Sequence, residues 1–142
     1  MKQKKGFTLI ELLVVVGVIS ILAATVVVNL RGARERAMDS RVASALGQVR
    51  VVAEMIHARH NTYASLCAGA VLSTTTAELA TLSAEIDLNN GGSPAAVCHA
   101  SATDYCVSAL LIEGGTSHWC VRSDGRAGRA TSACGGATLG CW

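Results

Sequence analysis

The most apolar part of the chain is a run of 24 residues from Phe7 to Leu30, which contains one charged residue, Glu11, and no proline. At about 1.5 Å per residue, an α-helix over this run is roughly 36 Å long. That length is sufficient to cross the hydrocarbon core of a bilayer. Residues 7–30 are therefore predicted to form a membrane-spanning helix.

The pattern changes after Leu30 without any signal that ends the helix. Apolar residues recur at steps of three and four positions between Ala37 and Ile56, which is typical of an amphipathic helix with one face packed on a core. No proline occurs before Asn61. A single helix over residues 7–60 is therefore predicted, apolar all round in its first half and striped in its second half.

Residues 61–142 are predicted to form a small globular head. Thr75 and Glu78 fit a capping box, and the apolar residues that follow share one face. These features predict a short helix over residues 76–87. Residues 89–103, which begin Asn-Asn-Gly-Gly-Ser-Pro, are predicted to be a loop.

Two segments rich in β-forming residues follow, at residues 104–112 and 117–122, and a glycine-containing turn separates them. This arrangement predicts a β-hairpin. The glycine- and alanine-rich tail signals a third short strand only weakly. A long helix packed on a small antiparallel sheet places the chain in the α+β class.

Six cysteines all lie beyond the apolar run. An even number of cysteines on one side of a membrane indicates disulfides in an oxidising compartment, so the head is expected outside the cytoplasm. A small head with few aromatic residues also needs such bridges for stability. All six cysteines are predicted to be paired: Cys67, Cys98, Cys106, Cys120, Cys134 and Cys141.

The sequence does not select one of the fifteen pairings that six cysteines allow. The two arms of the predicted hairpin carry one cysteine each, and two cysteines in the tail would close a short loop. Whether the hairpin cysteines share a face depends on a turn register that the sequence leaves open. The default set pairs Cys106 with Cys120, Cys134 with Cys141, and Cys67 with Cys98.

The formal charge of +2 depends on three lysines at the start of the chain. Without them the chain has nine arginines and ten acidic residues and is nearly neutral. Arg122, Arg126 and Arg129 could contact nucleic-acid phosphate, but Asp124 lies among them, and nucleic-acid-binding domains are usually strongly basic. A solvated loop is the favoured interpretation, and a nucleic-acid partner is not favoured.

The sequence contains no pattern that is typical of a catalytic or metal site. The cysteines include no C-x-x-C pair, which is the commonest zinc and redox signature. His57 and His60 could share a helical face, but no carboxylate lies at a matching spacing, and histidine is favoured near a helix C-terminus in any case. No enzyme activity, cofactor or metal is expected.

The first six residues, MKQKKG, form a basic leader. The apolar run after it exceeds the apolar core of a secretory signal, about 7 to 15 residues, and lacks a small-residue cleavage site. The junction KKGFTLIELLVVV resembles the N-terminus of bacterial type IV pilins and of the related pseudopilins of type II secretion. This resemblance implies that a prepilin peptidase cleaves after Gly6, that the new N-terminal Phe7 is methylated, and that Glu11 guides assembly.

Glu11 is unfavourable in an apolar span, because moving an ionised carboxylate from water into such surroundings costs several kcal/mol of free energy unless the charge is paired. No charged residue within the span could neutralise it. The resemblance implies that the partner is the N-terminal amine of a neighbouring subunit. The alternative is a protonated glutamate that reaches out from the end of the helix.

The resemblance also implies the organisation of the whole chain. Residues 1–6 are a leader that is removed, 7–30 a membrane span and later filament core, 31–60 the amphipathic half of the helix, and 61–142 a disulfide-rich head. The shape expected is that of a pilin, a lollipop with the helix as its stem. The head segments YCVSA and WCVRSDG are also similar to sheet segments of many pilins.

The function that this organisation implies is that of a structural subunit of a type IV pilus-like surface filament. Its partners would be other copies of itself, the prepilin peptidase, the pilus assembly machinery of the inner membrane, and the membrane before assembly. The precursor would cross the membrane once, and the assembled filament would be extracellular. The alternatives are a pseudopilin or minor pilin that primes or tips a secretion or competence filament, and a membrane-anchored adhesin or DNA-uptake module.

Overall fold

The computed structural model of the protein describes residues 6–92, 95–113, 115–136 and 139–141. The leader expected at residues 1–6 lies outside the described residues except for Gly6. The chain divides into two compact units, residues 1–34 and 35–142. Each unit is described separately below.

The long helix predicted from the sequence is confirmed. Helix α1 runs over 52 residues, Leu9–His60, and begins two positions later than expected. Its first part has a mean hydropathy of 2.7 and is long and apolar enough to cross a membrane. The helix ends where Asn61 adopts a left-handed backbone with a φ of 54°, and the Asn61 amide donates to the His57 carbonyl at 2.7 Å.

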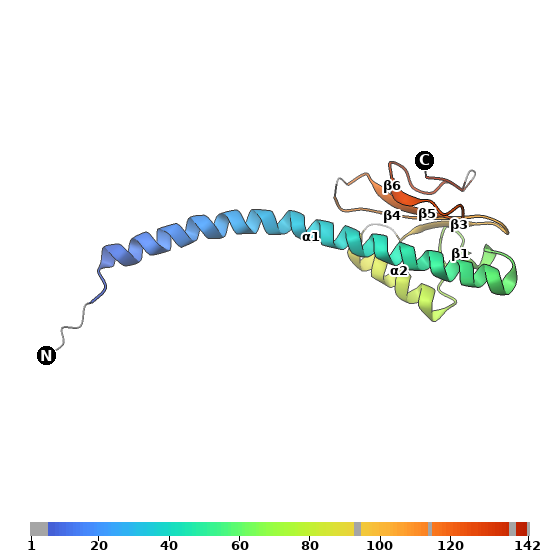
Figure 1. Ribbon diagram of the computed structural model, residues 1–142, viewed down its shortest axis with the longest axis horizontal. Coiled ribbons are helices and arrows are strands. Elements are labelled where there is room, and N and C mark those ends of the chain that lie inside the picture. The colour runs from blue at the N-terminus through green and yellow to red at the C-terminus, as the bar shows by residue number, and fades with distance from the viewer. Residues whose placement is uncertain (1–5, 93–94, 114, 137–138, 142) are drawn as a thin grey trace. The chain divides into compact units, whose positions relative to one another are not determined.

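The second unit contains a six-stranded antiparallel sheet in which each strand pairs with its neighbour in sequence (Figure 1). The predicted hairpin corresponds to β4 and β5, and the weakly signalled third strand to β6. Strand β3 lies inside the segment predicted as a loop, so the prediction for residues 89–103 was wrong in its second half. The strands are β1 (Cys67–Ala68), β2 (Val71–Leu72), β3 (Val97–Ala100), β4 (Tyr105–Leu110), β5 (His118–Arg122) and β6 (Ala127–Ala130).

Helix α2 (Ala77–Asn89) confirms the short helix predicted from the capping signal, but the cap is displaced by one residue. Thr76 is the N-cap, and its hydroxyl accepts from the Leu79 amide at 3.4 Å. Thr75 instead shares a hydrogen bond with the Ser73 hydroxyl at 2.9 Å. Threonine can cap a helix at either position, but only Thr75 has a glutamate three residues later, so the capping-box signal placed the cap one residue too early.

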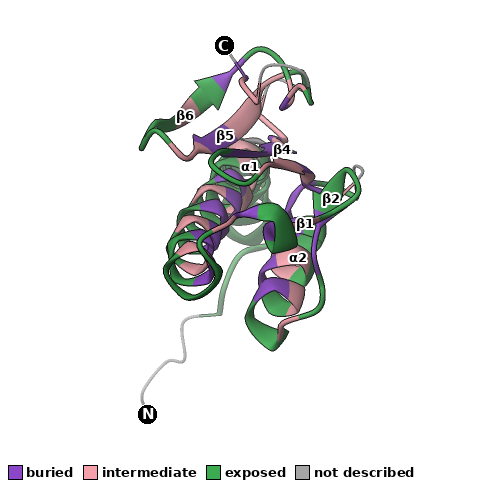
Figure 2. Cartoon of the chain, turned by 90° about the vertical axis from the view of Figure 1, so that its right-hand side faces the viewer, coloured by how far each residue is buried: buried purple, intermediate pink, exposed green. Residues whose placement is uncertain are grey.

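One face of the sheet packs against α2 and the second part of α1 (Figure 1). Helix α2 and the second part of α1 each carry buried positions along one side and exposed positions along the other (Figure 2). A short 3-10 helix, Ala64–Leu66, contributes Leu66 to the same core. The largest fully buried side chains there include Tyr105 and Leu46.

The opposite face of the sheet is covered by the C-terminal segment (Figure 1). Successive residues of a strand point to opposite faces, so Tyr105 and Val107 enter the helix-packed core while Cys106 and Ser108 point the other way. The head therefore has two cores, a large one under the helices and a small, cysteine-rich one under the C-terminal segment.

Candidate processing and assembly site

Three residues precede α1 in an irregular conformation, namely Gly6, Phe7 and Thr8. Phe7 is 80% exposed. No atom of the described chain lies within 4 Å of the point where a Cβ would stand on Gly6. The peptide bond between Gly6 and Phe7 is thus accessible in an irregular segment outside the helix.

Thr8 and Glu11 form a reciprocal cap at the start of α1. The Thr8 amide and hydroxyl both donate to Glu11 Oε2, at 2.9 and 2.6 Å, and the Glu11 amide donates to Thr8 Oγ1 at 3.4 Å. This is the capping-box arrangement, in which two unpaired backbone amides of the first turn are satisfied by side chains. The chain itself thus supplies two hydrogen bonds to the Glu11 carboxylate.

The first unit presents an almost continuous apolar surface around the helix. Its large apolar side chains are between 51% and 80% exposed. Apolar surface of this extent is rare on soluble monomers and marks contact with a membrane or with other proteins. Glu11 is the one charged residue on this surface from Phe7 to Val27.

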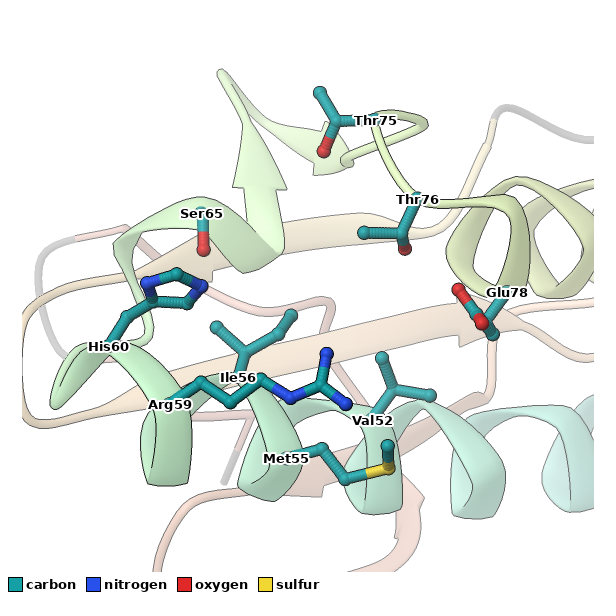
Figure 3. A pocket seen from close by; sticks show the side chains of 9 residues that line it. All are labelled: Val52, Met55, Ile56, Arg59, His60, Ser65, Thr75, Thr76 and Glu78. Atoms are coloured by element: carbon teal, nitrogen blue, oxygen red, sulfur yellow. The ribbon is translucent and has the colours of Figure 1, made fainter.

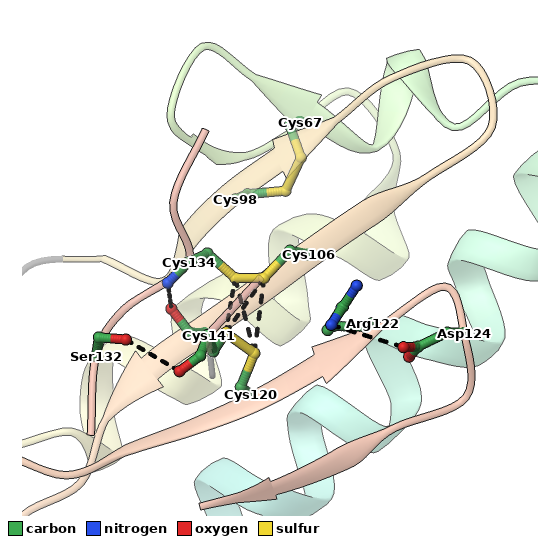
Figure 4. Close-up of a disulfide and its surroundings, with 10 residues drawn as sticks. Cys67, Cys98, Cys106, Cys120, Arg122, Asp124, Ser132, Cys134 and Cys141 are labelled. Carbon is green, nitrogen blue, oxygen red and sulfur yellow. Dashed lines mark hydrogen bonds and ion pairs between the residues drawn. A yellow bond between two sulfur atoms is a disulfide. The ribbon is translucent and has the colours of Figure 1, made fainter. Parts of the chain in front are cut away.

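All six cysteines are paired, as predicted, but two of the three default pairs were wrong (Figure 4). Cys67 bonds to Cys98 as expected. The other bridges join Cys106 to Cys134 and Cys120 to Cys141. The hairpin register explains this difference, because it sets Cys106 opposite Arg122 and Cys120 opposite Ser108. The two hairpin cysteines share a face but lie diagonally, and each bonds to the tail above it.

The loop between β4 and β5 is attached to α1 by one buried carboxylate. Asp39 is 5% exposed and accepts hydrogen bonds from the backbone amides of Ile112, at 2.7 Å, and Glu113, at 3.1 Å. Glu113 in turn pairs with Arg36 at 3.1 Å and with Arg129 at 2.8 Å. The hydrogen bonds from Arg129 and then Arg36 lower the pKa of the Glu113 carboxyl.

The three arginines considered as a phosphate-binding patch form ion pairs with acidic side chains of the head. Arg122 and Arg126 both pair with Asp124, at 3.6 and 3.7 Å. Arg129 pairs with Glu113. This pairing favours the interpretation of a solvated, locally neutralised loop.

The two histidines near the end of α1 do not form a joint site among the described residues. His57 stacks on the ring of Tyr63, with ring centroids 4.4 Å apart. His60 lines a groove of about 270 Å³ between α1 and the start of α2 (Figure 3). Ser65 lines the same groove, but no hydrogen bond joins it to His60 in the described part of the chain. The groove is lined by Val52, Met55, Ile56, Arg59, His60, Ser65, Thr75, Thr76 and Glu78.

Two features of this site were missed in the sequence, and only the first of them has a signal there. The spacing Thr-x-x-Glu ahead of an apolar run indicates the cap between Thr8 and Glu11. Asp39 is one of three acidic residues in the striped half of the helix, and nothing in the sequence indicates that it reaches a loop 73 residues away.

Comparisons with known proteins agree with this geometry. Residues 1–27 match the family model of the prokaryotic N-terminal methylation motif. The chain is 46% identical over 65 residues to the type IV wide pilus major component PilA4 of Thermus thermophilus, an alignment covering 46% of the chain and 50% of PilA4. It is 47% identical over 51 residues to the type IV major fimbrial protein FimA of Dichelobacter nodosus, which covers 36% of the chain and 33% of FimA.

These matches cover about half of one curated relative and a third of the other. No solved structure matches the chain. The chain thus carries a prokaryotic N-terminal methylation motif, and type IV pilins are among its homologues.

Proposed function

We propose that this protein is a structural subunit of a type IV pilus-like surface filament. The observation that carries the proposal is the fully exposed apolar part of α1, with one carboxylate at its start and an accessible glycine-phenylalanine junction ahead of it. The methylation motif over residues 1–27 and the pilin homologues support it. Before assembly the same apolar surface would sit in the membrane.

Processing would begin at the irregular segment ahead of α1. A prepilin peptidase would cleave after Gly6, remove the basic leader and methylate the amine of Phe7. Cleavage would create a positive amine four residues ahead of Glu11. The capping box would hold the Glu11 carboxylate at the first turn of the helix, where the amine of a neighbouring subunit could reach it.

Assembly would follow from the apolar surface. Subunits extracted from the membrane would bury their helices against one another, because exposed apolar area of this size is unfavourable in water. A carboxylate in that apolar filament core is costly unless it is paired. The pairing of Glu11 with an amine would therefore fix the axial position of each subunit.

The head would face outward and remain outside the cytoplasm. Its three disulfides suit an oxidising compartment. A role in nucleic-acid uptake has less support, because Arg122, Arg126 and Arg129 are each paired with a carboxylate. A minor pilin or pseudopilin would share all of these features and would differ in copy number.

Surface filaments sheared from cells and analysed by mass spectrometry test the proposal. We expect this chain, beginning at Phe7, as the main component of the filaments, and loss of the filaments when its gene is deleted. Filaments that persist at normal yield without the chain would contradict the structural role. Filaments that disappear while the chain is found only in trace amounts would favour a minor, priming subunit.

A further inference from the structure

The four cysteines of the small core are the most concentrated set of metal-binding groups in the described chain. Their four Sγ atoms lie within 4.8 Å of one another. All four residues are buried, with at most 6% exposure. They come from two strands and from two points of the C-terminal segment: Cys106, Cys120, Cys134 and Cys141.

The two disulfides of this cluster are in contact with each other. Sulfur atoms of different bridges are 3.2 to 3.9 Å apart, across the pairs Cys106–Cys120, Cys106–Cys141, Cys120–Cys134 and Cys134–Cys141. In a zinc site with four thiolates and Zn–S bonds of about 2.3 Å, neighbouring sulfurs of the tetrahedron are roughly 3.8 Å apart. The distances between sulfurs of different bridges are therefore close to the edge length of such a tetrahedron.

Strand pairing and two hydrogen bonds position these cysteines in addition to the disulfides. Cys106 and Cys120 are fixed by the register of β4 and β5. The Cys134 amide donates to the buried Ser108 hydroxyl at 2.9 Å, and the Ser132 hydroxyl donates to the Cys141 carbonyl at 3.0 Å. Such contacts would keep the four side chains converging after the sulfur–sulfur bonds are broken.

The donor set selects the class of ion. Thiolates are soft ligands that favour Zn²⁺ or Cu⁺ over Mg²⁺ and Ca²⁺. No carboxylate or imidazole belongs to the cluster as the structure describes it.

We propose that the head binds one Zn²⁺ through Cys106, Cys120, Cys134 and Cys141 when a thiol or phosphine reductant has opened their two disulfides. The reductant supplies four electrons, and four protons complete the four thiols. Binding of Zn²⁺ by four thiolates then releases these four protons. Metal and disulfides exclude each other, because a sulfur that is bonded to another sulfur is no longer a thiolate.

The proposed site gives the small core two alternative crosslinks. In oxidising surroundings, two disulfides attach the C-terminal segment to the sheet. Where the thiols stay reduced, one metal ion would make the same attachment. A metal-bound cluster would also keep the four cysteines together. Exchange with two equivalents of a small-molecule disulfide, which takes up the four electrons, would then release the Zn²⁺, pair these cysteines with one another and leave Cys67 for Cys98.

A Co²⁺ titration of the full chain in detergent, reduced and kept free of oxygen, tests the proposal. Co²⁺ is the probe because its charge-transfer and ligand-field bands report thiolate ligands and tetrahedral geometry. We expect one equivalent of Co²⁺ per chain with the spectrum of a four-thiolate tetrahedral site, and displacement of that Co²⁺ by one equivalent of Zn²⁺. Absence of binding by the reduced chain would overturn the proposal.

Two variants identify the ligands. Cys106→Ser removes one ligand and should abolish the four-thiolate spectrum. The double variant Cys67→Ser/Cys98→Ser removes the remote bridge and should keep one full equivalent with an unchanged spectrum. A reduced chain that had unfolded would offer all six thiols without preference, so altered binding by the double variant would also overturn the proposal.

Discussion

Asp39 accepts a hydrogen bond of 2.7 Å from the backbone amide of Ile112, a residue 73 positions further along the chain. The same carboxylate accepts a second bond from the next amide in the loop. A buried acceptor that satisfies two partly buried donors is costly to remove, because the donors are then left without a partner. This contact determines where the β4–β5 loop meets the helix.

We expect Asp39→Ala to lower the free energy of unfolding of the head by about 1 to 3 kcal/mol, since two amides lose their acceptor. Asp39→Asn should cost less, because one carbonyl oxygen remains. Urea unfolding followed by circular dichroism measures the change. Asp87→Ala is the matched control, because Asp87 is exposed on α2, and its effect should stay within about 0.5 kcal/mol. Equal effects of the two alanine variants would contradict the anchoring role.

Glu113 should make the stability of the folded head depend on pH in the acidic range. Hydrogen bonds from Arg129 and Arg36 lower the pKa of Glu113 from its ordinary value of 4.5. A carboxyl whose pKa is lower in the folded state stabilises that state above its unfolded pKa, and this stabilisation is lost as the pH falls through the folded value. We expect Glu113→Gln to reduce the loss of stability between about pH 5 and pH 3.

Thermal midpoints over this pH range measure the effect in the parent and the variant. Glu35→Gln is the control, because Glu35 has no ion pair with a described residue. High salt should weaken the dependence on Glu113, since Arg36 and Arg129 are at least half exposed. An unchanged acid profile in Glu113→Gln would contradict the prediction.

The sequence was sufficient to predict the elements of the fold whose signals are local. The apolar run, the change to a striped pattern and the β-rich segments each depend on neighbours a few residues apart. Strand β3 was missed because only four residues, Val97–Ala100, pair there, and they follow a segment rich in glycine and asparagine. Its pairing with β4 depends on a partner beyond the turn, not on its own composition.

The disulfides show why the rest could not be predicted. Six paired cysteines follow from their number and location, but the connectivity depends on strand register. The register sets Cys106 opposite Arg122, so the nearest sulfur above it belongs to the tail. A shift of one residue would have placed the hairpin cysteines on different faces. No sequence signal fixes that register in the loop at residues 111–117.

Processing should depend on glycine at position 6. We expect Gly6→Val to block cleavage, so that the mass of the membrane-bound chain includes residues 1–6. The described chain has room for a side chain at this position, so a block would reflect the peptidase and not the fold of the subunit. Gly17→Ala is the control, because that position is equally open, and it should be processed normally. Efficient cleavage of Gly6→Val would contradict the proposed junction.

Substitutions of Glu11 should affect stability in the membrane and assembly into filaments in opposite directions. We expect Glu11→Ala to stabilise the helix in a bilayer, because a costly carboxylate is removed, and to reduce the yield of filaments to a small fraction. Glu11→Gln keeps an acceptor for Thr8 and removes the charge, so it should assemble as poorly as Glu11→Ala. Thr8→Ala removes the hydroxyl that donates to the carboxylate and accepts from the Glu11 amide, but it keeps the charge of Glu11 and should assemble better than either. Filament yields equal to the parent in Glu11→Ala would refute a role in assembly.

The disulfide connectivity can be tested by a tryptic digest under non-reducing conditions. The chain has no lysine beyond its leader, so trypsin yields one peptide of residues 60–122 with four cysteines and one of residues 130–142 with two. Bridges from Cys106 to Cys134 and from Cys120 to Cys141 hold these peptides together.

Pairing within the hairpin and within the tail would instead release the two peptides as separate masses, which makes the digest decisive between the two arrangements. We expect one joined species that separates only after reduction. A second cleavage after Glu113 then divides Cys106 from Cys120, and cleavage after Leu139 divides Cys134 from Cys141. The fragment that contains Cys106 should remain attached to Cys134. Its attachment to Cys141 would show that the neighbouring sulfurs, 3.2 Å apart in the structure, had formed the bond instead.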